Sequence, residues 1–192
     1  MADVSFRTDG VKQKALKILV IGDMHVGKSS LLLRFCRNAF NPNMRATIGV
    51  DYLLKTLTID QVDYLFQIWD TVGHERFRAI TTSADSFTSV KTWYRNLERN
   101  APPGTNRILV ANKCDQKDKR VVTTRQGRDL AEALDMDYFE TSASSGEGVE
   151  AMFTAIATQV KRRVIDKDSG KMAESSPSFA LQSEDGREGC CA

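Results

Sequence analysis

Residues 22–29 have the pattern Gly-x-x-x-x-Gly-Lys-Ser. An apolar run at residues 16–21 precedes the pattern and predicts a buried strand. Apolar residues between Leu31 and Phe35 follow it and predict the packed face of a helix over residues 27–38. A strand, a glycine-containing loop and a helix in this order are the context in which the pattern binds phosphate. A glycine-rich turn without a ligand is the less favoured alternative.

The residue types in this loop explain why it suits a phosphate chain. Gly22 and Gly27 let the backbone curl until its N–H groups face one anion. The helix N-terminus adds a partial positive charge, Lys28 is long enough to reach the terminal phosphates, and Ser29 offers a hydroxyl to Mg²⁺. The sequence therefore predicts a nucleoside triphosphate and Mg²⁺ as ligands.

Length and composition indicate one domain with flanking segments. The chain has 192 residues, an ordinary hydrophobic fraction of 41% and a net charge of +2. We expect a polar lead-in at residues 1–15, a domain at 16–165 and a disordered tail at 166–192, where apolar residues are too sparse to build a core. Because no long basic run is present, nucleic acid is not expected as a partner.

The cysteines and the hydropathy pattern indicate which cellular compartment to expect. No apolar stretch is long enough to span a bilayer, and the first residues lack a signal-peptide pattern. Cys36 and Cys114 fall inside predicted elements, whereas Cys190 and Cys191 are nearly terminal. Because cysteines placed in this way do not make a disulfide framework, we expect a reducing, cytosolic setting.

The rest of the pattern alternates strands and helices, which is typical of an α/β fold with a mostly parallel sheet and helices on both faces. Residues 50–59 and 62–69 flank a two-residue turn and predict an antiparallel hairpin. Apolar residues spaced 3, 4 and 3 apart from Phe87 to Leu97 predict an amphipathic helix. The other predicted elements are a short helix at 77–82, a short buried strand at 108–111, a helix at 123–134 capped by Thr123 or Thr124, a strand at 138–141 and a helix at 149–160.

Two segments after the loop supply further groups for the phosphates and the base. Asp70 ends a predicted strand, where its carboxylate can hold Mg²⁺ through water, and the Gly73 N–H can approach a γ-phosphate. The run Asn112-Lys113-Cys114-Asp115 follows another strand, at the edge where doubly wound sheets bind ligands.

Guanine is the base that this second segment favours. Asp115 can accept hydrogen bonds from N1–H and the N2 amino group of guanine, a donor pair that adenine lacks. A backbone N–H at Ser142-Ala143 suits the guanine O6. These features argue against the alternative of a P-loop ATPase or nucleotide kinase.

At this point the chain resembles the Rab family of Ras-superfamily GTPases, which regulate membrane traffic. The segments that carry the likeness are Ile48-Gly49-Val50-Asp51-Tyr52, Gln67-Ile68-Trp69 and Arg76-Phe77-Arg78-Ala79-Ile80, within a resemblance over residues 16–163. It implies that Thr47 binds Mg²⁺ and senses the γ-phosphate, and that Phe40 lies against the guanine ring. It also implies that residues 40–52 and 71–82 are two switches, ordered by GTP and relaxed after hydrolysis.

The resemblance extends to partners and location. Cys190-Cys191-Ala192 is too short for a CaaX box but resembles the paired-cysteine ending that Rab proteins present for double geranylgeranylation. Two lipid chains give stable anchoring where one gives only marginal binding. The implied partners are exchange factors, GTPase-activating proteins, effectors, an escort protein and a dissociation inhibitor. The implied location is the cytoplasmic face of an intracellular membrane, in exchange with the cytosol.

Together these inferences define a candidate site for GTP or GDP with Mg²⁺. The predicted catalytic residues are Lys28 and His74, and the predicted metal-binding residues are Ser29, Thr47 and Asp70. The predicted nucleotide-binding residues are Gly22, Asp23, Met24, His25, Val26, Gly27, Lys28, Ser29, Ser30, Phe40, Thr47, Gly73, Asn112, Lys113, Asp115, Ser142 and Ala143.

Several positions depart from the family pattern near the chemistry. His74 stands where the family has the glutamine that orients the attacking water, and an imidazole has a different reach. Val72 replaces a usual alanine, and Met24 and His25 replace small residues in the loop. Met24 would crowd the water or an incoming arginine finger, so we predict slow hydrolysis. Ser144 also replaces a usual lysine near the base.

A larger departure follows Thr82. Asp70 and Asn112 are 42 positions apart, which by the resemblance is short by about 15 residues, enough for one strand with its connections. The family places that strand in the middle of the sheet, between the strands at 16–21 and 108–111. If the sheet closed over the gap, the loop at 112–115 would shift by about 4.8 Å relative to the phosphate loop. A deleted isoform with impaired nucleotide binding, acting as a non-enzymatic binder of Rab partners, is therefore the alternative function.

Overall fold

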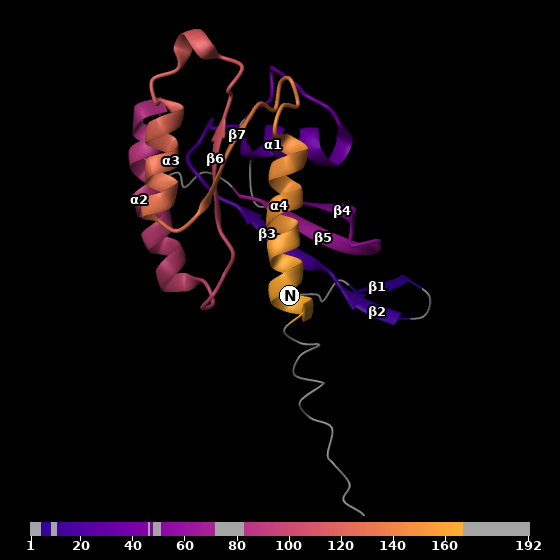
Figure 1. Ribbon diagram of the computed structural model, residues 1–192. Helices are drawn as coiled ribbons and strands as arrows, with labels where there is room; N and C mark the ends of the chain where they lie inside the picture. Colours follow the sequence, from indigo (N-terminus) through magenta and orange to yellow (C-terminus); the bar gives the residue numbers. More distant parts are fainter. Residues whose placement is uncertain (1–4, 9–10, 46, 48–50, 72–82, 167–192) are drawn as a thin grey trace, which may run out of the picture.

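The computed structural model describes residues 5–8, 11–45, 47, 51–71 and 83–166. The described residues form strands and helices in alternation, as the sequence predicts for an α/β fold (Figure 1). The strands are β1 Ser5–Thr8, β2 Val11–Lys14, β3 Leu16–Val20, β4 Asp51–Ile59, β5 Val62–Asp70, β6 Ile108–Asn112 and β7 Asp137–Thr141. The helices are α1 Lys28–Arg37, α2 Ser83–Asn100, α3 Thr124–Ala133 and α4 Val149–Lys161, with short helical turns at Lys117–Lys119 and Arg162–Asp166.

The larger sheet has the order β3-β5-β4. β3 runs parallel to β5, with Ile18 opposite Ile68, and β4 pairs with β5 in antiparallel fashion. Asp60 and Gln61 join β4 to β5 with φ angles of 52° and 63°. Two consecutive residues in the left-handed region make the tight turn that matches the twist of a hairpin, so the predicted hairpin is confirmed.

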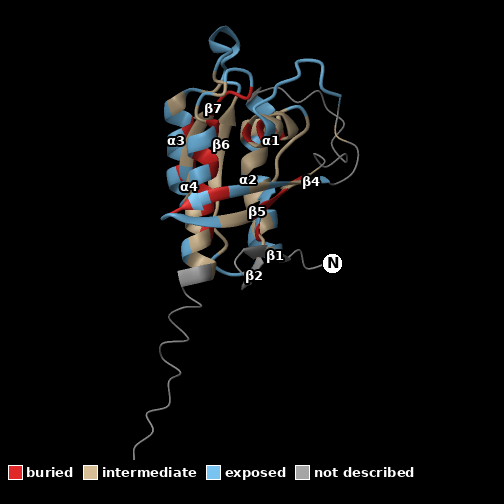
Figure 2. Cartoon of the chain, turned by 90° about the vertical axis from the view of Figure 1, so that its right-hand side faces the viewer, coloured by how far each residue is buried: buried red, intermediate tan, exposed pale blue. Residues whose placement is uncertain are grey.

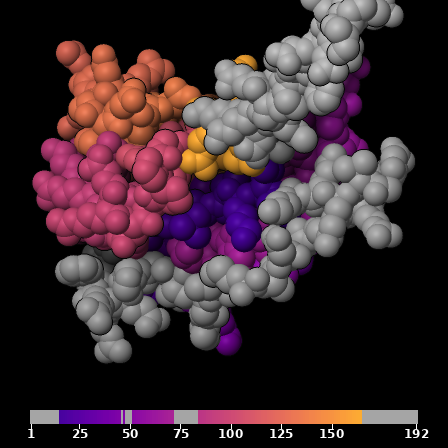
Figure 3. All heavy atoms as spheres, turned by 90° about the horizontal axis from the view of Figure 1, so that it is seen from below, coloured from indigo at the N-terminus to yellow at the C-terminus, as the bar shows by residue number. Residues whose placement is uncertain are grey.

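A second, separate sheet consists of the parallel strands β6 and β7. Within the described part of the chain no strand lies between β3 and β6, and these two strands do not pair with each other. Seen from below, atoms of β3 (indigo) are in view between α4 (yellow) and the pink segment that contains α2 (Figure 3). The sheet is therefore split where the sequence predicts the loss of a central strand.

The core lies on one face of the larger sheet. Phe66 and Ile68 of β5 have no exposed area, and the rings of Phe35 from α1 and Phe153 from α4 stack with centroids 4.2 Å apart. Figure 2 shows buried segments in red on the helices and strands that form this core. Because α4 packs against both β3 and β7, it joins the two sheets on this face.

The elements beside the gap are less well covered than the sequence predicts. Residues 108–111 are predicted as a buried strand, but all five residues of β6 are only half-buried, and this part of the prediction is wrong. The predicted amphipathic helix α2 is present, yet none of its residues 84–100 is buried. Central parallel strands are buried by neighbours on both sides, so losing one strand leaves its neighbours partly exposed.

The N-terminal segment also differs from its prediction as a polar lead-in. β1 and β2 pair in antiparallel fashion from Ser5↔Lys14 to Thr8↔Val11, and the hairpin projects away from the two sheets (Figure 1). Asp9-Gly10, a residue pair that favours tight hairpin turns, is the sequence signal for it. The predicted helix at 77–82 and the tail from residue 167 lie outside the described residues.

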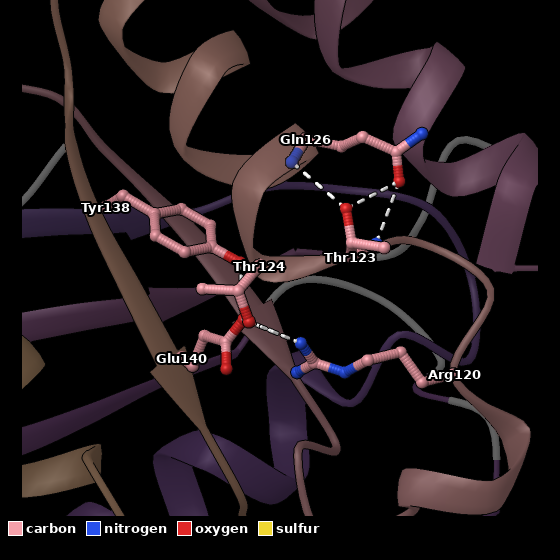
Figure 4. A network of polar contacts seen from close by, with 6 residues as sticks. All are labelled: Arg120, Thr123, Thr124, Gln126, Tyr138 and Glu140. Atoms are coloured by element: carbon pink, nitrogen blue, oxygen red, sulfur yellow. Dashed lines mark hydrogen bonds and ion pairs between the residues drawn. The ribbon is translucent and has the colours of Figure 1, made fainter.

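A polar network fastens α3 and the loop before it to β7 (Figure 4). Glu140 Oε1 accepts hydrogen bonds from Arg120 Nη1 at 2.9 Å, Thr124 Oγ1 at 2.8 Å and Tyr138 Oη at 2.8 Å. Thr123 caps the helix by accepting from the Gln126 N–H, as the sequence predicts. The bond from Arg120, followed by those from Thr124 and Tyr138, outweighs burial and lowers the pKa of Glu140 to about 2.

We expect Glu140→Gln to destabilise the fold in a pH-dependent way. The folded pKa of about 2 lies below the ordinary value of 4.5, so the carboxylate stabilises the fold fully above about pH 4.5 and loses this effect as the pH falls toward 2. Because the site is partly exposed, we expect a loss of about 1 kcal/mol at pH 7. Urea unfolding at pH 7 and pH 3 measures the difference.

The matched control is Glu132→Gln, the same chemical change at an exposed position of α3. It is expected to leave the unfolding midpoint unchanged at both pH values. A Glu140→Gln loss that stays equal from pH 7 to pH 3 would contradict the electrostatic explanation and indicate lost packing instead.

Candidate nucleotide-binding site

The loop between β3 and α1 has the backbone geometry that its glycines permit. Gly22 and Gly27 have φ angles of 144° and 98°. A Cβ atom on Gly27 would lie 2.5 Å from Asn112 Nδ2, so the Asn112 side chain would have to move and its hydrogen bond to the Val26 carbonyl would be disturbed. His25 also adopts a positive φ, of 62°. The second glycine of the motif is therefore required by the close approach of β6 as well as by its own conformation.

Lys28 lies across the mouth of this loop. Its Nζ donates to the carbonyl oxygens of Gly22 at 2.8 Å and Asp23 at 2.9 Å, and the side chain is buried. Burial lowers the pKa of Lys28, and the nearby carboxylates of Asp70 and Asp23 oppose this shift. The Lys28 ammonium group is thus held at the loop by two carbonyl oxygens. A bound phosphate would be a stronger partner for it, because a phosphate is negatively charged.

Three oxygen-bearing side chains from separate segments converge beside Lys28. Ser29 Oγ lies 2.5 Å from Thr47 Oγ1 and donates a hydrogen bond to Asp70 Oδ2. The other carboxylate oxygen, Asp70 Oδ1, is buried and has no hydrogen-bond partner among the described residues. Two hydroxyls and a carboxylate with a buried, unpaired oxygen fit the hard oxygen ligands that Mg²⁺ prefers. The three residues that the sequence predicts for Mg²⁺ therefore lie together.

The loop after β6 contacts the phosphate loop directly. Asn112 Nδ2 donates to the Val26 carbonyl at 2.9 Å, and Lys113 Nζ donates to the His25 carbonyl at 2.6 Å. The sheet does not close over the gap, so the shift of about one strand spacing that closure would cause is absent. The predicted base-binding and phosphate-binding segments thus meet despite the lost strand.

The base end of the site is held by side chains from β7 and the loop after it. Ser142 Oγ donates to Asp115 Oδ1 at 2.6 Å, which orients the carboxylate. Ser142 has no exposed area, so it supports Asp115 from behind rather than lining the site. The sequence predicts that a backbone N–H of this segment meets the guanine O6. The Ala143 N–H donates to Asn112 Oδ1 at 3.2 Å.

These segments surround one cleft of about 500 Å³. Phe40 is 38% exposed and lines it, as do Thr47 at one end and Asp115 at the other. Gly22, Asp23 and Val26 lie in the surrounding loop and contribute the carbonyl contacts already described. The predicted site residues that line the cleft are Met24, His25, Gly27, Lys28, Ser29, Ser30, Phe40, Thr47, Asn112, Lys113, Asp115 and Ala143.

Three residues at the site are not among the predicted site residues. Arg34 of α1 donates to the carbonyls of Ala143 at 2.8 Å and Ser144 at 2.7 Å, and so ties the first helix to the base end. Thr71 lines the cleft and donates to the Val20 carbonyl at 2.7 Å. Trp93 of α2 donates from Nε1 to Asp23 Oδ1 at 2.8 Å. Arg34 and Trp93 belong to no motif, and only the fold brings them to the site, whereas Thr71 is the first residue of the predicted switch at 71–82.

Four predicted residues lie outside the described part of the chain, namely Gly73, His74, Cys190 and Cys191. In the part that is described, no helix combines the length and apolar character needed to cross a membrane.

Comparison with known proteins agrees with the motifs. A model described as "Ras family" matches residues 17–84 and 79–162. The chain is 40% identical to "Ras-related protein Rab-8B" of Dictyostelium discoideum, over 79% of this chain and 82% of the relative. It is 39% identical to "GTP-binding protein ypt2" of Schizosaccharomyces pombe, over 80% and 85%. It is 41% identical to "Ras-related protein Rab-1D" of Dictyostelium discoideum, over 78% and 81%.

The same comparisons locate the lost segment. The family match breaks into two parts at residues 79–84, which include Thr82 and Ser83. The Rab-8B alignment extends over 167 positions, whereas 79% of this 192-residue chain is about 152 residues, so about 15 positions have no counterpart here. The chain is a small GTPase of the Rab type within the Ras superfamily, and the residues that the structure describes include no strand between β3 and β6.

Proposed function

We propose that this chain binds GTP and GDP with Mg²⁺ in the cleft between the phosphate loop and the base loop. The observation that carries the proposal is the pair of hydrogen bonds from Asn112 and Lys113 to the carbonyls of Val26 and His25. These bonds hold the two ends of a nucleotide site in one cleft, although the sheet beneath them is split.

Each group in the cleft has a role in the proposal. The loop amides and Lys28 bind the phosphates, while Ser29, Thr47 and Asp70 hold Mg²⁺, which balances phosphate charge when bound. Asp115 accepts the two guanine donors in the orientation that Ser142 gives it. Phe40 covers the base from the exposed side of the cleft. Gly73, from its place in the sequence, donates to the γ-phosphate.

We further propose that hydrolysis is slow. Met24 and His25 line the cleft at its phosphate end, where bulk competes with an attacking water. His74 stands in the sequence position of the residue that orients this water. A GTPase that hydrolyses slowly remains bound to GTP longer, so its return to the GDP state depends more on GTPase-activating proteins.

The traffic role and membrane attachment belong to the same proposal. Regulation of vesicle traffic is the general role of Rab proteins, and lipidation of Cys190 and Cys191 would hold the chain on the cytoplasmic face of an intracellular membrane. Exchange factors, GTPase-activating proteins, effectors, an escort protein and a dissociation inhibitor are the corresponding partners. A missing central strand supports a second candidate, a chain with impaired nucleotide binding that acts only by binding such partners.

Purification without added nucleotide separates the two candidates. We expect about one equivalent of GDP to remain bound. EDTA should release it, because the chelator removes the Mg²⁺ that Ser29, Thr47 and Asp70 are proposed to hold. Chromatography of the denatured protein measures the bound nucleotide, and competition with ATP tests the choice of base. Protein that is folded yet empty, and stays empty with excess Mg²⁺ and GDP, would favour the non-enzymatic candidate.

Asp115→Asn is expected to weaken GDP binding by roughly 100-fold. The carboxylate accepts two hydrogen bonds from guanine, and replacing it with an amide costs about 3 kcal/mol. Asp118→Asn, the same change three positions further on at an exposed residue, is the matched control and is expected to bind GDP normally. Titration with a fluorescent GDP analogue measures both. Equal affinities for the two variants would remove Asp115 from the proposed site.

His74→Gln is expected to accelerate single-turnover GTP hydrolysis by about tenfold, which corresponds to about 1.4 kcal/mol in the barrier. Glutamine has an amide N–H and a carbonyl that can align the water together. The dissociation rate of GDP serves as the control measurement, because the substitution acts on the water rather than on nucleotide binding. If the unsubstituted chain hydrolyses GTP at the rate of ordinary Rab proteins, the proposal of slow hydrolysis is wrong.

A further inference from the structure

Arg34 joins α1 to the loop that leads from β7 to α4 (Figure 1). Its Nε donates to the Ala143 carbonyl at 2.8 Å, and its Nη2 donates to the Ser144 carbonyl at 2.7 Å. The two acceptors are consecutive residues, 109 and 110 positions away from the arginine. A guanidinium group holds its N–H donors in a fixed planar fork, so it can bind two neighbouring acceptors at once. We call this pair of hydrogen bonds the arginine clamp.

The third nitrogen of the guanidinium group bonds to the end of its own helix. Arg34 Nη1 donates to the carbonyl oxygen of Asn38 at 3.3 Å and to Asn38 Oδ1 at 3.1 Å. Asn38 ends α1 in the left-handed conformation, with a φ angle of 48°. Because the guanidinium group is bonded to α1 and to the loop together, its position relative to both is fixed.

The loop that the clamp binds is a tight turn with its own hydrogen bonds. The Gly146 N–H donates to the Ser142 carbonyl at 2.8 Å, and the Ser142 N–H donates to the Glu147 carbonyl at 2.9 Å. The Ser145 N–H donates to Ser142 Oγ at 3.0 Å. Gly146 has a φ angle of 89°, and a Cβ atom there would lie 3.7 Å from Arg34 Cδ. The turn is therefore packed against the arginine side chain.

The clamp and the turn together set the direction of two backbone N–H groups. In a trans peptide group the carbonyl oxygen and the N–H point in opposite directions. The Ser142 carbonyl bonds within the turn, so the Ala143 N–H points out of it, toward Asn112 Oδ1 at 3.2 Å. The Ala143 carbonyl accepts from Arg34, so the Ser144 N–H points away from α1. Both Ala143 and Ser144 line the cleft.

The charge of Arg34 adds to this geometric effect. A hydrogen bond from an ionised donor is about twice as strong as one between neutral groups. Such a bond also polarises the peptide group whose carbonyl accepts it. Polarisation of the peptide group between Ala143 and Ser144 makes the Ser144 N–H a better donor to an oxygen in the cleft. In the proposed complex this oxygen is the guanine O6.

We propose that Arg34 is a positioning residue for guanine, which acts through the backbone of Ala143 and Ser144 on the O6 atom of the base. The inference rests on the proposed function, because it concerns the same cleft. It adds a role that Asp115 does not cover, since a carboxylate meets the donors of guanine and the clamped N–H groups meet its acceptor. Base selection then depends on α1, whose first residues Lys28 and Ser29 serve the phosphates and Mg²⁺.

Three nucleotides distinguish a role at O6 from a general effect on the fold. GDP and inosine diphosphate both carry the O6 oxygen, whereas 2-aminopurine riboside diphosphate has hydrogen at that position. We expect Arg34→Ala to weaken binding of the first two by about tenfold each, the effect of losing one good hydrogen bond. Binding of the 2-aminopurine nucleotide is expected to stay unchanged. Competition against a fluorescent GDP analogue, with Mg²⁺ present, measures all three affinities.

Three further variants test the geometry of the clamp. Arg34→Lys keeps the charge but lacks the fork, so we expect it to bind GDP only about threefold more weakly than the unsubstituted chain. Asn38→Gly removes the Oδ1 acceptor and tolerates the left-handed conformation, so all three affinities should stay unchanged. Arg37→Ala removes an exposed arginine three positions further along α1 and is the matched control for loss of charge. It is expected to bind all three nucleotides normally.

Amide hydrogen exchange tests the clamp without any nucleotide. The measurement uses the full chain after EDTA has removed bound nucleotide. We expect Arg34→Ala to accelerate exchange of the Ser145 and Gly146 amides, whose hydrogen bonds close the turn, by about tenfold. Arg37→Ala is expected to leave their exchange unchanged.

Three results would overturn the inference while the proposed function stands. If the unsubstituted chain binds GDP and Arg34→Ala weakens all three nucleotides equally, the role of Arg34 is structural only. Unchanged affinities in Arg34→Ala would remove the residue from base recognition. Unchanged exchange at Ser145 and Gly146 would show that the clamp does not order the turn. Failure of the unsubstituted chain to bind any of the three nucleotides would instead refute the proposed function, and the role at guanine with it.

Discussion

Hydrogen bonds between the base loop and the phosphate loop hold the two sheets together at the proposed site. Asn112 and Lys113 reach from the end of β6 to the carbonyls of Val26 and His25, and Gly27 permits this approach because it has no Cβ. The bonds connect the two sheets at the end where both sets of strands point. They keep the proposed nucleotide cleft assembled, although β3 and β6 belong to separate sheets.

Residues beside the missing strand are less buried than those of the surviving core. A central strand buries about four or five aliphatic side chains, a contribution of about 10 kcal/mol, against a total domain stability of about 5–15 kcal/mol. The missing burial is visible at three places. All of β6 is only half-buried, none of residues 84–100 of α2 is buried, and Leu19 is exposed. The surviving core between α1, α4 and β5 is intact, as the stacked rings of Phe35 and Phe153 illustrate.

Much of the site was predictable because its motifs carry their chemistry in consecutive residues. The phosphate loop, the carboxylate at Asp70 and the base loop each follow a strand, and strand ends meet at one edge of a parallel sheet. Side chains that act singly were not predictable. Arg34 and Trp93 reach the site from the middle of helices, where spacing shows only which face a residue occupies and not which loop that face meets.

The amino-acid sequence alone was enough to identify the family and the order of the elements, and it indicated a guanine nucleotide as the ligand, because these depend on local patterns and on residue chemistry. It also located the deletion, since a shortened spacing is visible without coordinates. Only the tertiary structure decided what the deletion does. Whether two strands close over a gap depends on the balance between pairing their edges and keeping distant loop contacts, and here Asn112 remains on Val26 while β3 and β6 stay apart. That balance is set by groups 86 positions apart in the chain, so no local pattern contains it.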